Sequence, residues 1–208
     1  MEVELKYTVD SRKTADRIWN DPQLKELEED DSRSSNDFRG TYYDTEDYDL
    51  FRHDIAYRLR TEGNKLVASL KWNGKNTGPL HKREELNITL GDARQPKDPD
   101  PSVFCESEEG GELLELVGDK KLIEMIQVNV LRRSFRVDIG ESIVELSLDD
   151  GEILAGGGSD PVCELELELY SGSEEDLVQL GEELQERYRL TPGRVSKFVR
   201  GLKLLGVH

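Results

Sequence analysis

The sequence predicts a mainly antiparallel β fold with flanking helices (α+β), in which eight strands close into a barrel. Eight segments of the 208-residue chain show the two-residue alternation or the β-branched and aromatic content of strands. Most of the links between them are short and contain glycine or proline, which favours antiparallel neighbours because parallel strands need a longer crossover. The strands combine a charged face with a hydrophobic face, so a closed sheet can hold charges inside while helices cover its outside.

The first and last strands carry an unusual charge pattern. Residues 1–7 place Glu, Glu and Lys at even positions and Val, Leu and Tyr at odd positions, and residues 163–169 place three glutamates opposite leucines. One such strand is typical of a solvated sheet face. Carboxylates two positions apart on one face lie about 7 Å from each other, and five of them on facing strands would repel unless a cation lay between them. Because Mg²⁺ and Mn²⁺ take oxygen ligands of this kind, the two strands predict a metal site.

The first half of the chain mixes helical and strand patterns. A helix is expected after a cap at Asp10 or Ser11 and a shorter one from Pro22, because these residues precede apolar positions at helical spacing. An acidic loop is expected over 28–37 and an irregular or short helical link over 44–54. The expected strands, joined by turns at 62–64 and 73–79, are 39–43, 55–61, 66–72 and 83–90.

The second half returns to strands after a helical insertion. A loop over 91–101 leads into helically spaced apolar residues at about 102–127. Two C-terminal helices are expected within about 173–205, interrupted at Pro192-Gly193. We expect residues 1–208 to form a single domain. The remaining strands, with turns at 140, 150–151 and 156–158, are expected at 130–138, 143–148 and 162–170.

The composition limits the classes of partner. Lys and Arg number 28 against 45 Asp and Glu, a formal charge of −17 that argues against binding to DNA or to an anionic membrane. An anionic ligand would therefore need a local basic site. The two cysteines lack metal-ligand spacing, and neither a signal peptide nor a transmembrane segment is evident, so we expect a protein of the reducing cytoplasm. A monomer or a homodimer fits the sequence.

Basic residues recur with a two-residue period in the middle strands. Arg58 and Arg60 share one strand face, and Lys71 lies on the matching face of the next strand. Each pair alone is typical of a solvated face. Together, in a closed sheet, they predict a polar interior. The candidate basic residues are Lys6, Arg58, Arg60, Lys71, Arg83, Arg132, Lys197 and Arg200, set against Glu2, Glu4, Glu85, Asp149, Glu164 and Glu166.

A lining of this kind suits a compact polyanion that is bridged to the protein by a metal ion. Arginine forks match phosphate oxygens and lysine supplies point charge. No glycine-rich phosphate loop and no Ser/His/Asp or Cys/His nucleophile set is apparent. Phosphate would therefore be held by side chains.

Several motifs occur in a fixed order along the chain. It opens with Glu-Val-Glu-Leu-Lys at 2–6, an ExExK pattern that is weak alone. The others lie at 42–45, 57–60, 69–71, 78–85, 148–152, 163–169 and 196–201. With these motifs the chain resembles the CYTH superfamily, also called triphosphate tunnel metalloenzymes, over essentially its whole length. Within it, the chain looks most similar to bacterial inorganic triphosphatases, and the family fold is an eight-stranded antiparallel tunnel.

The resemblance implies roles for the charged residues. It implies that Mg²⁺ or Mn²⁺ is bound by Glu2, Glu4, Asp149, Glu164 and Glu166. It implies that a triphosphate is held by Lys6, Arg58, Arg60, Lys71, Arg83, Arg132 and Lys197, and Arg200 is a further candidate. The candidate catalytic residues are Glu4, Lys6, Glu85 and Lys197. Glu85 could orient water or simply pair with Arg83, and Glu168 has no assigned role.

The predicted function is metal-dependent hydrolysis of inorganic triphosphate to pyrophosphate and phosphate. One alternative is another triphosphate in the same tunnel: thiamine triphosphate, a nucleoside triphosphate, an RNA 5′ end, or ATP cyclised as in class IV adenylyl cyclases. The acidity of the chain disfavours RNA. A second alternative is a non-catalytic binder of nucleotide or polyphosphate, which would have little use for so many carboxylates.

Overall fold

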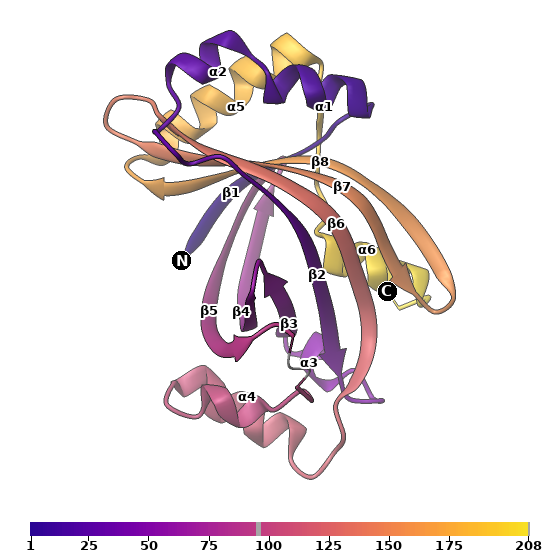
Figure 1. The fold of residues 1–208 in the computed structure, drawn as a ribbon. Coiled ribbons are helices and arrows are strands. Elements are labelled where there is room, and N and C mark those ends of the chain that lie inside the picture. The colour runs from indigo at the N-terminus through magenta and orange to yellow at the C-terminus, as the bar shows by residue number, and fades with distance from the viewer. Residues whose placement is uncertain (95–96, 208) are drawn as a thin grey trace.

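The computed structural model describes residues 1–94 and 97–207 and contains a closed antiparallel sheet (Figure 1). Its strand order is β5-β4-β3-β2-β6-β7-β8-β1, and β1 pairs with β5 to close the barrel. The predicted eight-stranded barrel is therefore confirmed. A short ninth strand, β9 (Thr191–Pro192), pairs with β1 and was not predicted. The barrel strands are β1 (Glu2–Thr8), β2 (Ser34–Asp44), β3 (Ala56–Glu62), β4 (Lys65–Thr77), β5 (Leu80–Asp92), β6 (Ile123–Asp138), β7 (Ile143–Ala155) and β8 (Gly158–Ser171).

Helices begin where the sequence supplies capping side chains. Ser11 accepts a hydrogen bond from the Thr14 N–H at the start of α1, and Ser196 does the same for Val199 in α6. None of the helices in the described ranges has the length and apolar character needed to cross a membrane. The helices are α1 (Arg12–Trp19), α2 (Pro22–Glu26), α3 (Asp49–Arg52), a 3-10 turn η1 (Pro101–Phe104), α4 (Glu108–Val117), α5 (Glu174–Tyr188) and α6 (Lys197–Leu204).

The barrel is polar inside and apolar outside. Along β1, Leu5 and Tyr7 are buried against the apolar side of α5, whose Leu177 and Leu184 belong to the same cluster. The alternate residues of β1 therefore point into the barrel, since successive side chains of a strand face opposite sides. The two-residue period of the sequence thus decides which charges enter the interior.

Three groups of helices cover the barrel (Figure 1). α1, α2 and α5 form a layer over β1, β7 and β8, while α3, η1 and α4 cover the outer faces of β3 and β4. α6 instead lies within the curve of β6, β7 and β8, where its Leu202 is buried with Ile126, Val128 and Ile153. α6 therefore brings its first residues to the barrel interior.

Several predicted boundaries are wrong. Residues 34–37 lie in β2 and not in an acidic loop, because their register with β6 continues to Ser34↔Ser134. The helical insertion does not extend to 127: α4 ends at Val117, and residues 123–127 begin β6. Ile126 is apolar because it packs against α6. Its spacing from the preceding apolar residues therefore resembled that of a helix, although it lies in a strand. Within the expected loop at 91–101, residues 95 and 96 lie outside the described residues.

Two predicted turns lie inside long strands. Gly151 stands opposite Val130 in the middle of the β6–β7 pair, and a Cβ there would collide with the Asn129 backbone. The glycine thus permits a close strand approach rather than a turn. At Asn73, which has a positive φ of 53°, β4 continues to Thr77 after a register shift between Trp72 and Lys75. That feature is a β-bulge.

Candidate active site

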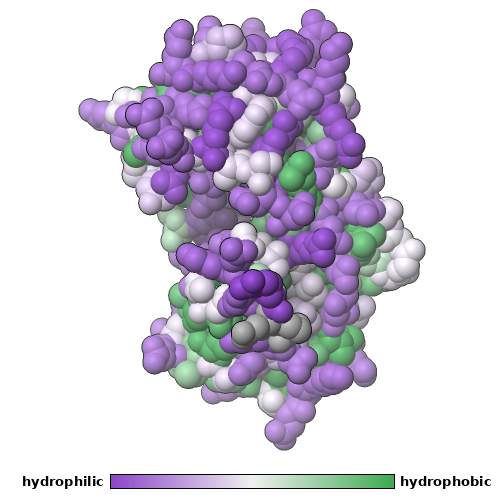
Figure 2. Space-filling view, in the orientation of Figure 1, coloured by the Kyte–Doolittle hydropathy of each residue, from purple (hydrophilic) through white to green (hydrophobic). Residues whose placement is uncertain are grey.

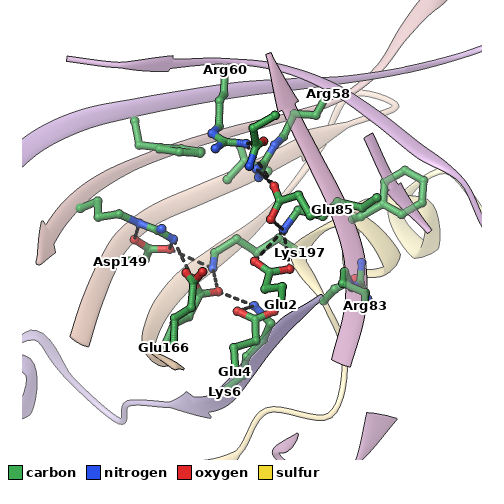
Figure 3. Close-up of a pocket in the computed structure, with 18 of the residues that line it drawn as sticks. Glu2, Glu4, Lys6, Arg58, Arg60, Arg83, Glu85, Asp149, Glu166 and Lys197 are labelled. Atoms are coloured by element: carbon green, nitrogen blue, oxygen red, sulfur yellow. Dashed lines mark hydrogen bonds and ion pairs between the residues drawn. The ribbon is translucent and has the colours of Figure 1, made fainter. Parts of the chain in front are cut away.

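A cavity of about 190 Å³ lies inside the barrel (Figure 3). It is lined from β1 to β8 and from the start of α6, so residues far apart in the sequence share it. Figure 2 shows a largely hydrophilic molecular face that is hollowed near its centre. The charged residues of the lining are Glu2, Glu4, Lys6, Arg58, Arg60, Glu62, Lys71, Arg83, Glu85, Arg132, Glu145, Asp149, Glu166, Glu168 and Lys197.

Glu166 is the centre of one ion-pair network. Lys6 Nζ lies 2.7 Å from both Glu166 Oε1 and Glu4 Oε2, and Lys197 Nζ lies 2.8 Å from Glu166 Oε1. Burial opposes ionisation of Glu166, but the charges of Lys197, Lys6 and Arg132 hold its pKa well below the ordinary value. The group is therefore a carboxylate at neutral pH.

Arg132 joins β7 to β8 across the cavity. Its Nε and Nη2 donate to the two oxygens of Asp149 at 2.7 Å each, and Nη2 also donates to Glu166 Oε2 at 2.7 Å. Lys197 Nζ contacts Asp149 Oδ2 at 2.9 Å. Asp149 is 2 % exposed, so these contacts form with little water between them. The planar fork of Arg132 fixes the orientation of this carboxylate.

Glu85 is the centre of a second network. Its carboxylate lies 3.0 Å from Lys71 Nζ, 3.4 Å from Arg60 Nη1 and 3.8 Å from Arg58 Nη2. Burial opposes ionisation, yet Lys71, Arg58 and Arg60 lower the pKa of Glu85 to about 2. The partners of Glu85 are thus these three residues, and the pairing with Arg83 considered from the sequence is not found.

Lys71 links the second network to β1. Its Nζ donates to both oxygens of Glu2, at 2.9 and 2.8 Å. Both networks therefore end on a carboxylate of the ExExK pattern, Glu2 for one and Glu4 for the other.

Two arginines keep unused donors in the cavity. Arg58 Nε and Arg83 Nε are buried and have no hydrogen-bond partner among residues 1–94 and 97–207. The Arg58 guanidinium lies 5.5 Å from the ring centres of Phe38 and Tyr42, and its Nη1 donates to the Tyr42 hydroxyl at 3.4 Å. Because an unsatisfied buried donor is costly, these two atoms indicate a place for an acceptor such as an anion oxygen.

Three carboxylates, Glu2, Glu4 and Glu168, lie close enough to influence one another. Burial raises the pKa of Glu168 to about 7, and the nearby charges of Glu2 and Glu4 act in the same direction. Burial also raises the pKa of Glu2, although Lys71 opposes that shift. A cation in this region would relieve both effects.

Most of the predicted site residues meet in this cavity, but two do not line it. Arg200 bonds to Asp160 at 2.8 Å and to the Pro161 carbonyl at 2.7 Å, and it also contacts Glu164. Glu164 lies at the edge, where its Oε2 is 2.7 Å from Lys197 Nζ. Arg200 therefore ties α6 to β8 and does not line the cavity, contrary to its expected place.

Sequence reasoning missed other lining residues. Three of them could have been found by continuing the two-residue alternation of β5, β7 and β8. These are Asn87, Glu145 and Glu168. The aromatic side chains Phe38, Tyr42 and Phe198 gave no such signal, because an apolar residue was assumed to face outward. Together the lining has seven basic residues and eight carboxylates, not the eight and six expected from the sequence.

The donor set fits a hard divalent cation in its chemistry. The carboxylates predicted as ligands supply oxygen atoms, the type that Mg²⁺ and Mn²⁺ take. Within the described residues, however, no three Asp, Glu, His or Cys side chains converge in a ligating arrangement. Lys6, Arg132 and Lys197 pair with the same oxygens that a metal ion would use. A lining with one excess negative charge becomes positive once a divalent ion is added.

Solved structures share this fold. A candidate adenylyl cyclase from Hippeastrum, reported to have a dominant triphosphatase activity, is 18% identical with a TM-score of 0.68, covering 100% of this chain and 97% of its own. A candidate adenylate cyclase from Bacillus halodurans is 21% identical with a TM-score of 0.55, covering 94% of each chain. At these identities the likeness establishes the fold alone.

Sequence comparison adds the family. The inorganic triphosphatase of Haemophilus influenzae is 30% identical over 164 residues, which are 79% of this chain and 45% of that protein. The chain thus spans about half the length of this curated relative. A family profile described as the CYTH domain matches residues 1–202. Because that match covers nearly all of the sequence, the chain belongs to the CYTH domain family.

Proposed function

We propose that this chain hydrolyses inorganic triphosphate to pyrophosphate and phosphate with the help of Mg²⁺ or Mn²⁺. The observation that carries the proposal is the interior cavity, where seven basic side chains interleave with carboxylates and where the buried Nε atoms of Arg58 and Arg83 lack an acceptor. A polyanion of phosphate oxygens supplies the missing acceptors. The similarity to an inorganic triphosphatase supports this substrate class.

The basic residues bind and position the triphosphate. Arg58 and Arg83 offer free donors on one side of the cavity, and Lys71 and Arg60 stand next to them around Glu85. Across the cavity, Lys6, Arg132 and Lys197 give up carboxylate partners in favour of phosphate oxygens. Positioning and charge stabilisation are the main requirements of phosphoryl transfer.

The carboxylates hold the metal and order the water. Glu2, Glu4, Asp149, Glu164 and Glu166 are the proposed metal ligands. When bound, a divalent ion neutralises phosphate charge and lowers the pKa of water for in-line attack on a terminal phosphorus. Glu85, ionised at neutral pH, is placed to accept a hydrogen bond from a water rather than to take its proton, because its pKa is about 2.

The test is a comparison of substrates. Purified protein is incubated with inorganic triphosphate, ATP or thiamine triphosphate, each with Mg²⁺, Mn²⁺ or a chelator, and phosphate and pyrophosphate are quantified. We expect metal-dependent, equimolar phosphate and pyrophosphate from inorganic triphosphate, and little product from the other two. Faster release from ATP or thiamine triphosphate would replace the proposed substrate. Tight triphosphate binding without turnover would instead identify a binding protein.

A further inference from the structure

His81 is a buried interior histidine that the proposed chemistry does not use. It lies near the start of β5, is 0 % exposed, and pairs with Glu4 across the β1–β5 ladder. It shares a face of β5 with Arg83 and Glu85, because side chains alternate along a strand. It is nevertheless absent from the lining of the cavity. His81 is therefore beside the active site and not in it.

The imidazole of His81 holds a backbone carbonyl. Its Nε2 lies 2.7 Å from the carbonyl oxygen of Gly193. Since a carbonyl only accepts, Nε2 carries a hydrogen. Nδ1 is buried and has no partner among the described residues. Burial lowers the pKa of His81, and the neighbouring charge of Lys6 acts in the same direction. The neutral Nε2–H tautomer is the form that fits this site.

Gly193 is also fixed from the opposite side. Its N–H donates to the Lys6 carbonyl oxygen at 2.8 Å, and the preceding residues Thr191 and Pro192 pair with Thr8 and Tyr7 of β1. A Cβ on Gly193 would lie 3.2 Å from the Lys6 backbone, so the segment packs closely on β1. The peptide of Gly193 is thus held between β1 and β5.

This clamp immediately precedes α6. Only residues 194 and 195 separate Gly193 from Ser196, which caps α6, and Lys197 is the first residue of that helix. Lys197 Nζ reaches Asp149 at 2.9 Å, Glu164 at 2.7 Å and Glu166 at 2.8 Å. The direction in which the chain leaves Gly193 is therefore one constraint on where the Lys197 ammonium enters the cavity, beside the packing of α6 on β6.

We infer that His81 is a positioning residue, which places Lys197 in the substrate cavity by holding the Gly193 carbonyl through Nε2–H. The inference rests on the proposed function, in which Lys197 contacts the triphosphate. It assigns His81 no contact with substrate or metal. Its effect is transmitted through the short link from β9 to α6.

Two pairs of variants test this inference by calorimetric titration with inorganic triphosphate in the presence of chelator. His81→Gln keeps an amide donor at the distance of Nε2, whereas His81→Asn has the same group too close to the backbone. We expect the Asn variant to weaken triphosphate affinity about tenfold or more, since small misplacements of a binding group are costly, and the Gln variant to stay within about threefold of wild type. Equal losses in both would overturn the inference.

The second pair asks whether the effect passes through Lys197. The His81→Asn change is repeated in a Lys197→Met background, where we expect less than about a twofold further loss because the positioned group is gone. Losses that multiply independently would show that His81 acts by another route. Thermal unfolding of each variant identifies any that fail to fold.

Nitrogen NMR of the wild-type protein tests the clamp without any variant. We expect the His81 ring to show a protonated Nε2 at pH 7. An Nδ1–H tautomer, which leaves Nε2 without a hydrogen, would contradict the inference. These measurements use binding and spectroscopy, so a wild-type protein that binds triphosphate without hydrolysing it would refute the proposed function and leave the assignment of His81 standing.

Discussion

Single carboxylates in the barrel interior have several cationic partners. Glu166 accepts from Lys6 and Arg132 at 2.7 Å each and from Lys197 at 2.8 Å. Removing one partner from a buried ion pair costs more than the pair itself contributes, because the remaining charge stays buried. Conservative substitutions that keep shape are therefore the informative ones at this site.

Glu4→Gln is expected to leave the barrel folded and to reduce turnover of triphosphate by at least about 10²-fold, the usual scale for removing one electrostatic group from an active site. The amide keeps the shape of the side chain, which is 5 % exposed, but loses the charge that pairs with Lys6 at 2.7 Å. Phosphate release and circular dichroism measure the two effects. A folded variant with wild-type turnover would exclude Glu4 from the metal site.

Lys197 and Arg200 allow a residue inside the cavity to be compared with a nearby residue that does not line it. Lys197→Met is expected to lower kcat/KM about 10²-fold, because its ammonium lies within the cavity network. Arg200→Met, one helical turn away, is expected to lower it less than about tenfold, because its partners Asp160, Pro161 and Glu164 do not line the cavity. Steady-state kinetics on both variants checks this order. The reverse order would place Arg200 on the substrate.

For single residues, the alternation of polar and apolar positions predicted which strand side chains face the barrel interior, but it did not place residues of helices. The period of two correctly placed Glu4, Lys6 and Arg58 on the interior side, since a strand offers only two faces. It could not show that Arg200 lies outside the cavity lining, because the rotation of a helix depends on packing. It also could not place Phe38, which faces inward between the guanidinium groups of Arg58 and Arg132.

Among the elements, α6 depends on a close contact with β6. A Cβ added to Gly201 would lie 2.5 Å from Ile126 Cγ2 and 2.7 Å from its Cδ1, whereas a Cβ on Gly111 in α4 meets nothing within 4 Å. The glycine lets α6 lie inside the curve of the sheet. Two glycines in helices therefore have opposite expected responses to the same substitution.

Gly201→Ala is expected to lower the free energy of unfolding by about 1–3 kcal/mol, because the methyl group overpacks the contact with Ile126. It should also reduce triphosphatase activity by moving Lys197. Gly111→Ala is the control and should raise the free energy of unfolding by about 0.5–1 kcal/mol, since alanine favours a helix. Urea denaturation measures both. A stabilised Gly201→Ala protein would contradict the packing described for α6.

Asp21 links α2 to α5 and gives stability a defined pH dependence. It accepts from the Tyr188 hydroxyl at 2.6 Å, from Arg187 at 2.8 Å and from the Gln23 N–H at 2.7 Å. Burial opposes its ionisation, but these hydrogen bonds lower the pKa of Asp21 in the folded state. The stabilisation is therefore complete above the unfolded pKa of about 3.9 and is lost as the pH falls through the folded value.

The variant Asp21→Asn can still cap α2 but cannot titrate. Between pH 5 and pH 3, an interval set by the unfolded pKa of about 3.9, we expect the free energy of unfolding to fall less steeply in the variant than in wild type. Urea denaturation at several pH values gives both slopes. Parallel slopes would mean that the Asp21 contacts do not favour its ionised form.

The predicted elements were more reliable in type than in extent. The eight strands and the two C-terminal helices appear, because their periodicity and caps are local properties. Their ends depend on partners: β7 continues past Gly151 because β6 and β8 continue beside it. Ile126 was assigned to a helix because its apolar neighbours contact α6, which lies far along the chain.

As a whole, the molecule combines an acidic overall charge with many basic side chains inside its barrel. Its formal charge is −17, yet basic side chains from five strands and α6 gather in the interior. The eight carboxylates among them leave the lining slightly negative, so an added divalent cation strengthens the binding of a polyanion. The pairing of β1 with β5 closes the sheet. This closure brings together charged residues that lie far apart in the sequence.

A crystal structure of Glu85→Gln with triphosphate and Mn²⁺, with anomalous scattering recorded for manganese, tests this arrangement most directly. The variant keeps the ExExK carboxylates and is expected to slow turnover. We expect triphosphate density in the barrel cavity, oxygens within hydrogen-bond reach of Arg58 Nε and Arg83 Nε, and a manganese peak beside Glu2 and Glu4. Triphosphate bound outside the barrel, or manganese away from these carboxylates, would contradict it.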